Sequence, residues 1–160
     1  MDNSQMFLVL GATVLLAILV LNVNRTILSS TDNTFQAQSI TAATSVAQQT
    51  IDLISSESFD ESTVTAAVTD INNFSAPASL GPESGESLNS YDDVDDYRNY
   101  STIVSTPRLG DVSVLVKVGY VNPALPDVLL SSRTRMKRIE VKAKSIYLPD
   151  TLRLYYYSSY

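Results

Sequence analysis

The chain of 160 residues contains no cysteine, no histidine and no tryptophan. Without cysteine, it can form neither a disulfide nor a thiolate metal site. Without histidine, it lacks the usual general base, the commonest ligand of transition metals and any Ser-His-Asp triad. A glycine-rich phosphate loop and a nucleophile motif are missing as well. We therefore expect no enzymatic activity, no small-molecule substrate and no organic cofactor.

Proline and glycine are scarce in the first half of the chain. No proline precedes Pro77, and Gly11 is the only glycine before Gly81. Because these residues are the main breakers of helices, their absence permits one long helix from about residue 2 to about residue 56. At 1.5 Å per residue it would be roughly 80 Å long. A local break at residues 22–24 is the alternative, since the Ser and Thr content of residues 26–50 lowers helix propensity.

A long apolar run opens this segment. Residues 6–21 carry no charge, no Asn or Gln and no proline. The run is slightly shorter than the roughly 20 residues that span a bilayer. A cleaved secretory signal fits poorly, because no Lys or Arg precedes Met6 and no Ala-x-Ala pattern follows Leu21. We expect the run to protrude and to be buried by lipid or by other copies of the chain.

Beyond Arg25, the apolar residues thin out to one face of the predicted helix. Their three-and-four spacing is typical of an amphipathic helix that packs on its own domain. The predicted stripe consists of Ile40, Ala43, Ala47, Thr50, Ile51 and Ile54, flanked by Phe35 and Val46.

From Tyr97 onward, the hydrophobic period changes to two, which indicates strands. The clearest strands cover residues 112–120, 137–147 and 151–157, after a first one near residues 100–105. Residues 122–126 are expected to form a turn. The short links between consecutive predicted strands favour antiparallel pairing. The residues predicted to face the core are Val112, Val114, Val116, Val118, Tyr120, Ile139, Val141, Ala143, Leu152, Leu154 and Tyr156.

The expected fold class is α+β, with a long N-terminal α-helix packed on an antiparallel β-sheet of about four strands. One face of the sheet would be covered by the helix and the other would be wet. We divide the chain into an apolar helix half (1–25), an amphipathic helix half (26–57), a connecting loop region (58–98) and the sheet (99–160). Within the connecting region, residues 63–71 are either a short helix or irregular.

Charge is distributed unevenly along the chain. Residues 61–100 hold eight acids and one base, whereas residues 101–160 hold nine bases and four acids. A basic third could bind nucleic acid. These charges alternate with apolar residues along the predicted strands, however, so we assign them to the wet face of the sheet and expect no nucleic-acid partner.

Four carboxylates stand within five residues at Asp92, Asp93, Asp95 and Asp96. Such a cluster could coordinate a structural Ca²⁺ together with backbone carbonyls, although the spacing is not that of an EF-hand. The alternatives are a solvated acidic loop or local turns made by the Asp side chains. General acid–base chemistry is disfavoured, because nothing nearby predicts a substrate pocket.

Three triplets match the N-glycosylation acceptor pattern, at Asn24, Asn73 and Asn99. Asn24 lies in the predicted helix, so Asn73 and Asn99 are the candidates. Residues 155–157 are three consecutive tyrosines, which could stack on sugars or bases. We favour a terminal strand with one buried and two outward rings.

Two stretches resemble type IV pilins and their pseudopilin relatives. Residues 47–52, followed by residues 58–60, are similar to the helix end of such subunits, and residues 91–100 resemble the Asp-rich segment that often precedes their first strand. The architecture resembles that family over the whole chain. The chain departs from the family in showing no basic leader and no proline in the apolar helix. Gln5 stands where the family has Glu, if Met1 is the mature start.

The resemblance implies a structural subunit of a helical extracellular filament. Such a subunit would lie in the inner membrane before assembly and on the cell surface afterwards. Its assembly would be a homo-oligomer with heterologous, non-closing contacts. The alternative is a single-pass membrane-anchored envelope or secretion-machinery protein whose β-rich domain binds a partner. The residues expected to mediate assembly are Gln5, Phe7, Leu8, Leu10, Gly11, Leu15, Leu16, Ile18 and Leu19.

Overall fold

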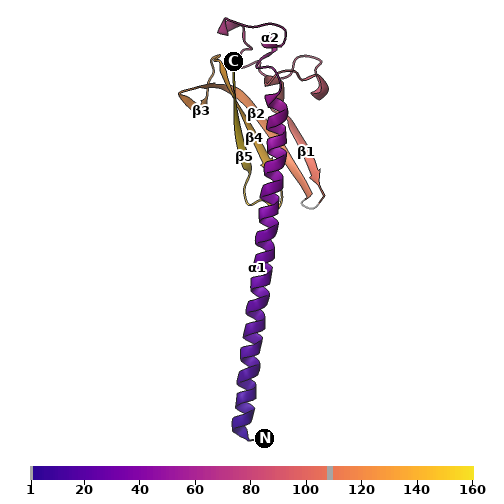
Figure 1. The fold of residues 1–160 in the computed structure, drawn as a ribbon, viewed down its shortest axis with the longest axis vertical. Helices are drawn as coiled ribbons and strands as arrows, with labels where there is room; N and C mark the ends of the chain where they lie inside the picture. Colours follow the sequence, from indigo (N-terminus) through magenta and orange to yellow (C-terminus); the bar gives the residue numbers. More distant parts are fainter. Residues whose placement is uncertain (1, 108–109) are drawn as a thin grey trace. The chain divides into compact units, whose positions relative to one another are not determined.

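The first element of the computed structural model, which describes residues 2–107 and 110–160, is a single helix, α1 (Asn3–Ser55; Figure 1). The alternative of a break at residues 22–24 is wrong, because these residues are helical. The hydroxyl of Thr26 donates to the carbonyl of Asn22 at 2.9 Å, and that of Thr31 donates to the carbonyl of Ile27 at 2.9 Å. These threonines thus satisfy their hydroxyls within the helix instead of competing with it.

Contacts within the chain define two units, Met1–Gln38 and Ser39–Tyr160. The N-terminal unit is the first part of α1, and its described residues, 2–38, are all exposed. The C-terminal unit contains the remainder of α1, the connecting region and the sheet. Burial therefore begins abruptly at Ser39, which is 2% exposed.

The C-terminal unit holds five antiparallel strands in its described part, one more than expected. Their order is β1-β2-β4-β5, and β3 pairs with the end of β2. The strands are β1 (Ser101–Thr106), β2 (Gly110–Asn122), β3 (Leu125–Leu129), β4 (Met136–Lys144) and β5 (Leu152–Ser159).

The turn expected over residues 122–126 is found at residues 123–124, and the extra strand, β3, begins directly after it at Leu125. Its Pro126 signals a turn in sequence, yet a proline is tolerated in a strand at the edge of a sheet, where its missing N–H is not needed. The pairing with β2 is irregular, with a register shift between Val121 and Asn122. The first strand, β1, lies where it was expected, near residues 100–105. Just before it, residues 95–97 form a 3₁₀ helix, η3 (Asp95–Tyr97).

The main core lies between the C-terminal part of α1 and one face of the sheet (Figure 1). The alternation along β2, β4 and β5 is confirmed, with Val116 and Val141 both fully buried as register partners. The helix stripe is rotated from the predicted one, because Ile40 is 42% exposed while Val46 is buried. The buried positions of α1 are Ser39, Ala43, Val46, Ala47, Ile51 and Ile54.

The connecting region forms a second, smaller core around Phe59, Phe74, Leu80 and Tyr120. Of the two alternatives for residues 63–71, the irregular one describes most of the stretch, and a single helical turn, α2 (Glu61–Val64), overlaps only its start. Asp60 caps its N-terminus, accepting a hydrogen bond from the backbone N–H of Ser62. Three single-turn 3₁₀ helices complete this region among the described residues: η1 (Ile71–Asn73), η2 (Leu88–Ser90) and η3.

Candidate functional site

The residues predicted to mediate assembly lie on the N-terminal unit, and the structure exposes all of them. Phe7 is 69% exposed, Leu8 73% and Leu15 69%. At Gly11, no described atom lies within 4 Å of the position that a Cβ would take. This apolar surface is defined as the exposed face of residues 3–24 and is called the N-terminal apolar surface below.

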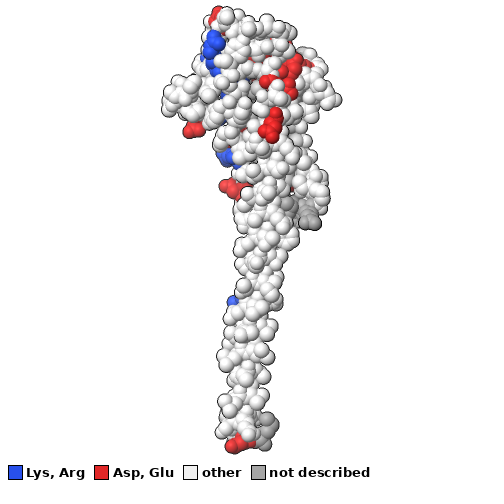
Figure 2. All heavy atoms as spheres, in the orientation of Figure 1, with Lys and Arg blue, Asp and Glu red and all other residues white. Residues whose placement is uncertain are grey.

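The N-terminal apolar surface is uncharged from end to end. Asp2 and Arg25 bracket it, and no charged residue stands between them. Figure 2 shows the corresponding stretch of helix as uniformly white, in contrast to the mixed charges on the C-terminal unit. The helix is long and apolar enough to cross a membrane. Such a surface is stable only when lipid or protein removes it from water.

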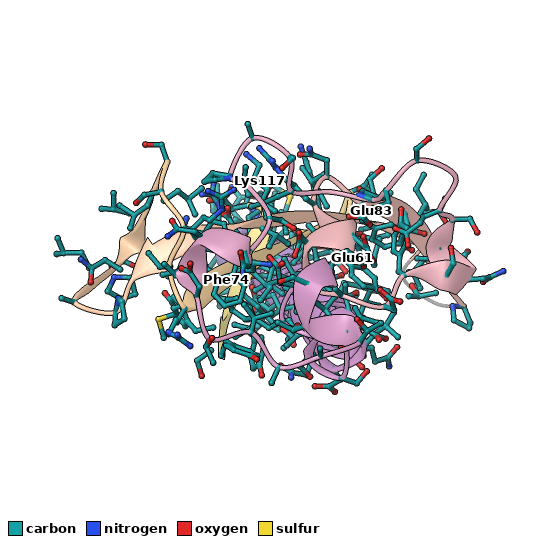
Figure 3. All side chains as sticks on the ribbon, turned by 90° about the horizontal axis from the view of Figure 1, so that it is seen from above. Glu61, Phe74, Glu83 and Lys117 are labelled. Atoms are coloured by element: carbon teal, nitrogen blue, oxygen red, sulfur yellow. The ribbon has the colours of Figure 1, made fainter. Side chains whose placement is uncertain are left out.

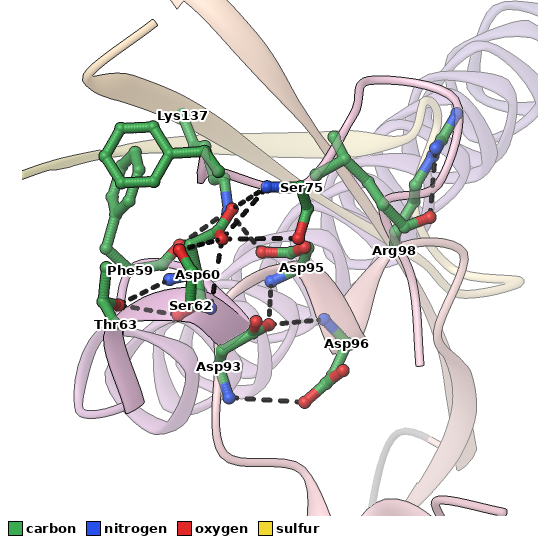
Figure 4. A network of polar contacts seen from close by, with 12 residues as sticks. Phe59, Asp60, Ser62, Thr63, Ser75, Asp93, Asp95, Asp96, Arg98 and Lys137 are labelled. Carbon is green, nitrogen blue, oxygen red and sulfur yellow. Dashed lines mark hydrogen bonds and ion pairs between the residues drawn. The ribbon is translucent and has the colours of Figure 1, made fainter. Parts of the chain in front are cut away.

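A second candidate site, not predicted from the sequence, is built around Lys137. Lys137 lies on β4 with the same parity as Ile139 and Val141, so the pleat turns its side chain to the core face. It is 0% exposed. Its Nζ donates to Asp60 Oδ2 at 2.9 Å, to the carbonyl of Phe59 at 2.7 Å and to the carboxylate of Asp95 (Figure 4).

The backbone brings these three partners together from distant parts of the chain. Ser58 pairs with Asp93 as an isolated parallel bridge, in which the N–H of Ser58 donates to the carbonyl of Asp92 at 3.0 Å and the N–H of Val94 donates to the carbonyl of Ser58 at 2.9 Å. The bridge sets the N-cap of α2 beside η3. Lys137 reaches both from the start of β4. A lysine at a core-facing position was the one sequence signal that could have revealed this cluster.

Asp60 is the most heavily hydrogen-bonded member of the cluster. Its carboxylate accepts from the backbone N–H of Ser75 at 3.0 Å, from the hydroxyl of Ser62 at 2.8 Å and from the hydroxyl of Tyr120 at 3.1 Å. Burial alone would raise the pKa of Asp60, but the hydrogen bond and charge of Lys137, together with Ser62 and Ser75, outweigh it and lower the pKa. Asp60 is thus held as a carboxylate.

The four aspartates of the predicted calcium cluster do not share one environment. Asp93, Asp95 and Asp96 are buried and Asp92 is partly buried, so the solvated-loop alternative is wrong. Asp93 Oδ1 accepts from the N–H groups of Asp95 at 2.7 Å and Asp96 at 3.1 Å. Asp96 Oδ2 accepts from those of Asp92 at 3.1 Å and Asp93 at 3.3 Å. These are the Asp-made local turns of the other alternative.

Burial raises the pKa values of three aspartates in this segment, and repulsion between neighbouring carboxylates adds to the effect. Burial, followed by the charges of Asp95 and Asp96, raises the pKa of Asp93 to about 8. Burial also raises the pKa of Asp95 and of Asp96. The Oδ2 of Asp93 and the Oδ1 of Asp96 are buried and have no hydrogen-bond partner among the described residues.

The carboxylates that converge well enough to hold a cation are a different set. Oxygens of Glu83, Glu86 and Asp96 lie within 4.8 Å of one another. We call these three residues the carboxylate trio. Burial and a hydrogen bond with Glu86 raise the pKa of Glu83 to about 7. Oxygen ligands of this kind suit Ca²⁺ or Mg²⁺. Of the four predicted aspartates, the trio includes only Asp96, and calcium binding by all four stays a prediction.

Glu61 lies near the same acidic region. Burial and the charges of Asp92, Glu86 and Asp96 raise its pKa. In the view from above, Glu61 and Glu83 lie on the same side of Phe74, and all three residues belong to the connecting region (Figure 3).

The remaining predicted site residues lie at the surface. Asn73 and Asn99 are both exposed, and Asn99 adopts a left-handed backbone with φ of 63°. Tyr155 is 48% exposed and lies under the guanidinium of Arg138, 5.4 Å from its ring centroid. Tyr156 packs against the core, as the alternation predicted.

The chain matches no protein-family model, no curated protein and no solved structure. Its arrangement, a long N-terminal apolar helix packed through its C-terminal part on an antiparallel sheet, is type IV pilin-like.

Proposed function

We propose that the chain is a structural subunit of a helical, type IV pilus-like filament, held in the membrane before assembly and joined to its neighbours through α1. One observation supports this most. The N-terminal apolar surface is wholly exposed, although it belongs to a helix whose C-terminal part is anchored in a core of its own.

The energetics favour a partner for this surface. At about 25 cal/mol per Å² of apolar area, burying a run of this length stabilises by on the order of tens of kcal/mol before ordering costs. A bilayer supplies that burial first, and sister helices supply it after assembly. Because each copy presents the same cylinder of apolar side chains, the contacts are heterologous and lead to helical symmetry.

Gln5 and Gly11 would have distinct roles in such a bundle. Gln5 carries an amide that can donate and accept hydrogen bonds, but it offers no charge to a neighbour's amino group. Gly11 removes a side chain from one turn of the helix, so a neighbour can approach the backbone there.

The test is to express the full chain with Leu15→Asp and to examine membranes and purified protein by fractionation and negative-stain electron microscopy. We expect fibres from the wild type and none from the variant, because a buried charge in an apolar bundle costs several kcal/mol. Ser29→Asp, an exposed position of the same helix beyond the apolar run, is the matched control and should leave fibres intact.

The alternative, a membrane-anchored protein with a partner-binding sheet, gives another pattern. It requires that the wild type remain in the membrane without fibres and disperse as monomers when the membrane is dissolved. Normal fibres from Leu15→Asp would contradict assembly through the N-terminal apolar surface.

A further inference from the structure

Lys137, Asp60 and Asp95 form a closed set of reactive groups in the core. Their side chains are 0%, 0% and 2% exposed. The ring of Phe59 lies 4.6 Å from the Lys137 nitrogen (Figure 4). The ring of Tyr120 lies 5.3 Å from the same nitrogen. A primary amine is therefore held against two carboxyl groups where water has no access.

We propose that Lys137 and Asp95 condense into an intramolecular amide, an isopeptide bond between Nζ of Lys137 and Cγ of Asp95, with Asp60 as the group that moves the protons. This inference stands on the core of the C-terminal unit alone, and it does not depend on the proposed filament function.

The geometry distinguishes the two carboxyl groups. The oxygens of Asp60 accept hydrogen bonds from Ser62, Ser75 and Tyr120 besides Lys137. These donors stabilise its negative charge, so Asp60 stays an unprotonated carboxylate. The carbon of a carboxylate is a poor electrophile, and its unprotonated oxygen is the one available to take a proton from Lys137. Asp95 belongs to η3, which holds its carboxyl group against the amine. The backbone N–H of Asp95 donates to Asp93 Oδ1 at 2.7 Å and so helps to fix η3. Asp95 is therefore assigned as the acyl group and Asp60 as the base.

The reaction balances without a co-reactant. Asp60 accepts a proton from the Lys137 ammonium across 2.9 Å, which leaves a neutral amine. The amine nitrogen attacks Cγ of the Asp95 carboxylic acid, so that a C–N bond forms and a C–O bond breaks. Asp60 takes a second proton from the nitrogen as it delivers one to the departing oxygen, which leaves as water. Nothing is oxidised or reduced, and holding the three groups in contact supplies the proximity that such a condensation needs.

The bond would link η3 to β4 across 42 residues of sequence. A chain without cysteine cannot make such a cross-link with a disulfide. An amide is also insensitive to reducing agents, unlike a disulfide.

The test is the intact mass of the purified full chain, denatured after folding. We expect a mass lower than the sequence mass by one water molecule, and a branched peptide that joins Asp95 to Lys137 in a protease digest. Lys137→Arg and Asp95→Ala should show their full sequence masses. Asp60→Ala should do the same although both condensing groups are present, because the proton acceptor is missing.

Two further variants sharpen the result. Asp95→Asn should lose ammonia instead of water and reach the same final mass as the cross-linked wild type. Lys142→Arg, on the same strand but partly exposed and 3.5 Å from Glu140, is the matched control and should keep the loss of one water. A folded wild type with its full sequence mass, a branched peptide at other residues, or a loss of water without a branched peptide would each overturn the proposal.

Discussion

The Nζ of Lys137 lies 2.9 Å from Oδ2 of Asp60, although the two residues are 77 positions apart in the sequence. The pair joins the N-cap of α2, just after the end of α1, to the start of β4. Tyr120 donates to the same carboxylate from β2. A single buried polar cluster thus holds the connecting region on the sheet at the place where the apolar helix stripe ends.

Replacement of Lys137 by Met should strongly destabilise the C-terminal unit. The substitution keeps the length of the side chain but leaves the Asp60 carboxylate buried without the Lys137 nitrogen that donates to it. Breaking a buried pair in this way typically costs about 3–5 kcal/mol. The measurement is chemical denaturation of the full chain in detergent, followed by the near-ultraviolet signal of its tyrosines.

The control for that experiment is Lys142→Met on the same strand. Lys142 lies 3.5 Å from Glu140, and its side chain is 21% exposed. Such a pair contributes at most about 1 kcal/mol. Equal losses of stability from the two substitutions would show that the buried partners of Lys137 contribute no more than the partly exposed pair of Lys142.

Asp93→Asn should change how stability depends on pH. The pKa of Asp93 is raised to about 8 from an ordinary value of 3.8. Between these values, the folded chain keeps a proton that the unfolded chain releases, so the contribution of Asp93 to stability falls as pH rises. The amide keeps the Oδ1 acceptor for the N–H groups of Asp95 and Asp96.

We expect Asn at position 93 to stabilise the chain by at least about 1 kcal/mol at pH 8, and to have little effect at pH 4. The measurement is the free energy of unfolding at several pH values across this range. Asp127→Asn, at an exposed position on β3, should leave the pH profile unchanged. A variant at position 93 that loses stability at pH 8 would mean that the carboxylate form is the native one.

Calcium should stabilise the C-terminal unit through the carboxylate trio. A divalent cation would offset the repulsion among Glu83, Glu86 and Asp96 and would satisfy the unpartnered Oδ1 of Asp96. A ligand at 100 times its dissociation constant adds about 2.7 kcal/mol to the free energy of unfolding. Thermal unfolding with increasing CaCl₂, and with MgCl₂ in parallel, measures the effect.

Glu86→Gln should reduce the response to calcium, because it removes one carboxylate of the trio. Without calcium it should not raise the melting temperature, because the N–H of Glu83 donates to the Glu86 carboxylate at 3.0 Å and lowers the pKa of Glu86. Glu61→Gln is the control, since Glu61 feels the charges of this region but does not belong to the trio. A wild-type melting temperature that is indifferent to calcium would exclude the trio as a cation site.

The helix stripe can be tested with two isoleucines of α1. Ile51 is 4% exposed and Ile40 is 42% exposed. Ile51→Ala should cost about 2–5 kcal/mol, because it leaves a cavity against the sheet, whereas Ile40→Ala should cost well under that. Comparable losses from the two substitutions would place Ile40 inside the core. Chemical denaturation of both variants under identical conditions gives the comparison.

Local sequence signals predicted a large part of the fold. The expected helix over residues 2–56 is α1 (Asn3–Ser55), because the absence of breakers acts residue by residue along the chain. The alternation in residues 112–120 and 137–147 placed the correct side chains on the core face. The strand β3 was missed, because Pro126 signals a turn locally and only its position at the sheet edge makes it tolerable.

The candidate sites were predicted less evenly. The N-terminal apolar surface follows directly from composition, since a run without charge or breakers can form only an apolar helix. Lys137 was not recognised, because its partners at Asp60 and Asp95 are 77 and 42 residues away. Of the carboxylate trio, only Asp96 was predicted from the sequence, as a member of the aspartate cluster. Glu83 and Glu86 lie in the preceding loop and were not predicted.

The sequence by itself therefore determined the long helix, its apolar first part and the two-residue period of the sheet, because each depends on neighbours within a few positions. Only the tertiary structure decided which face of α1 is buried, that Ser39 and Val46 belong to it and Ile40 does not, and that Lys137 is enclosed between two carboxylates. Those outcomes depend on which surfaces meet when distant segments pack, and the free energy of burying a charge or a side chain is set by the partners found there.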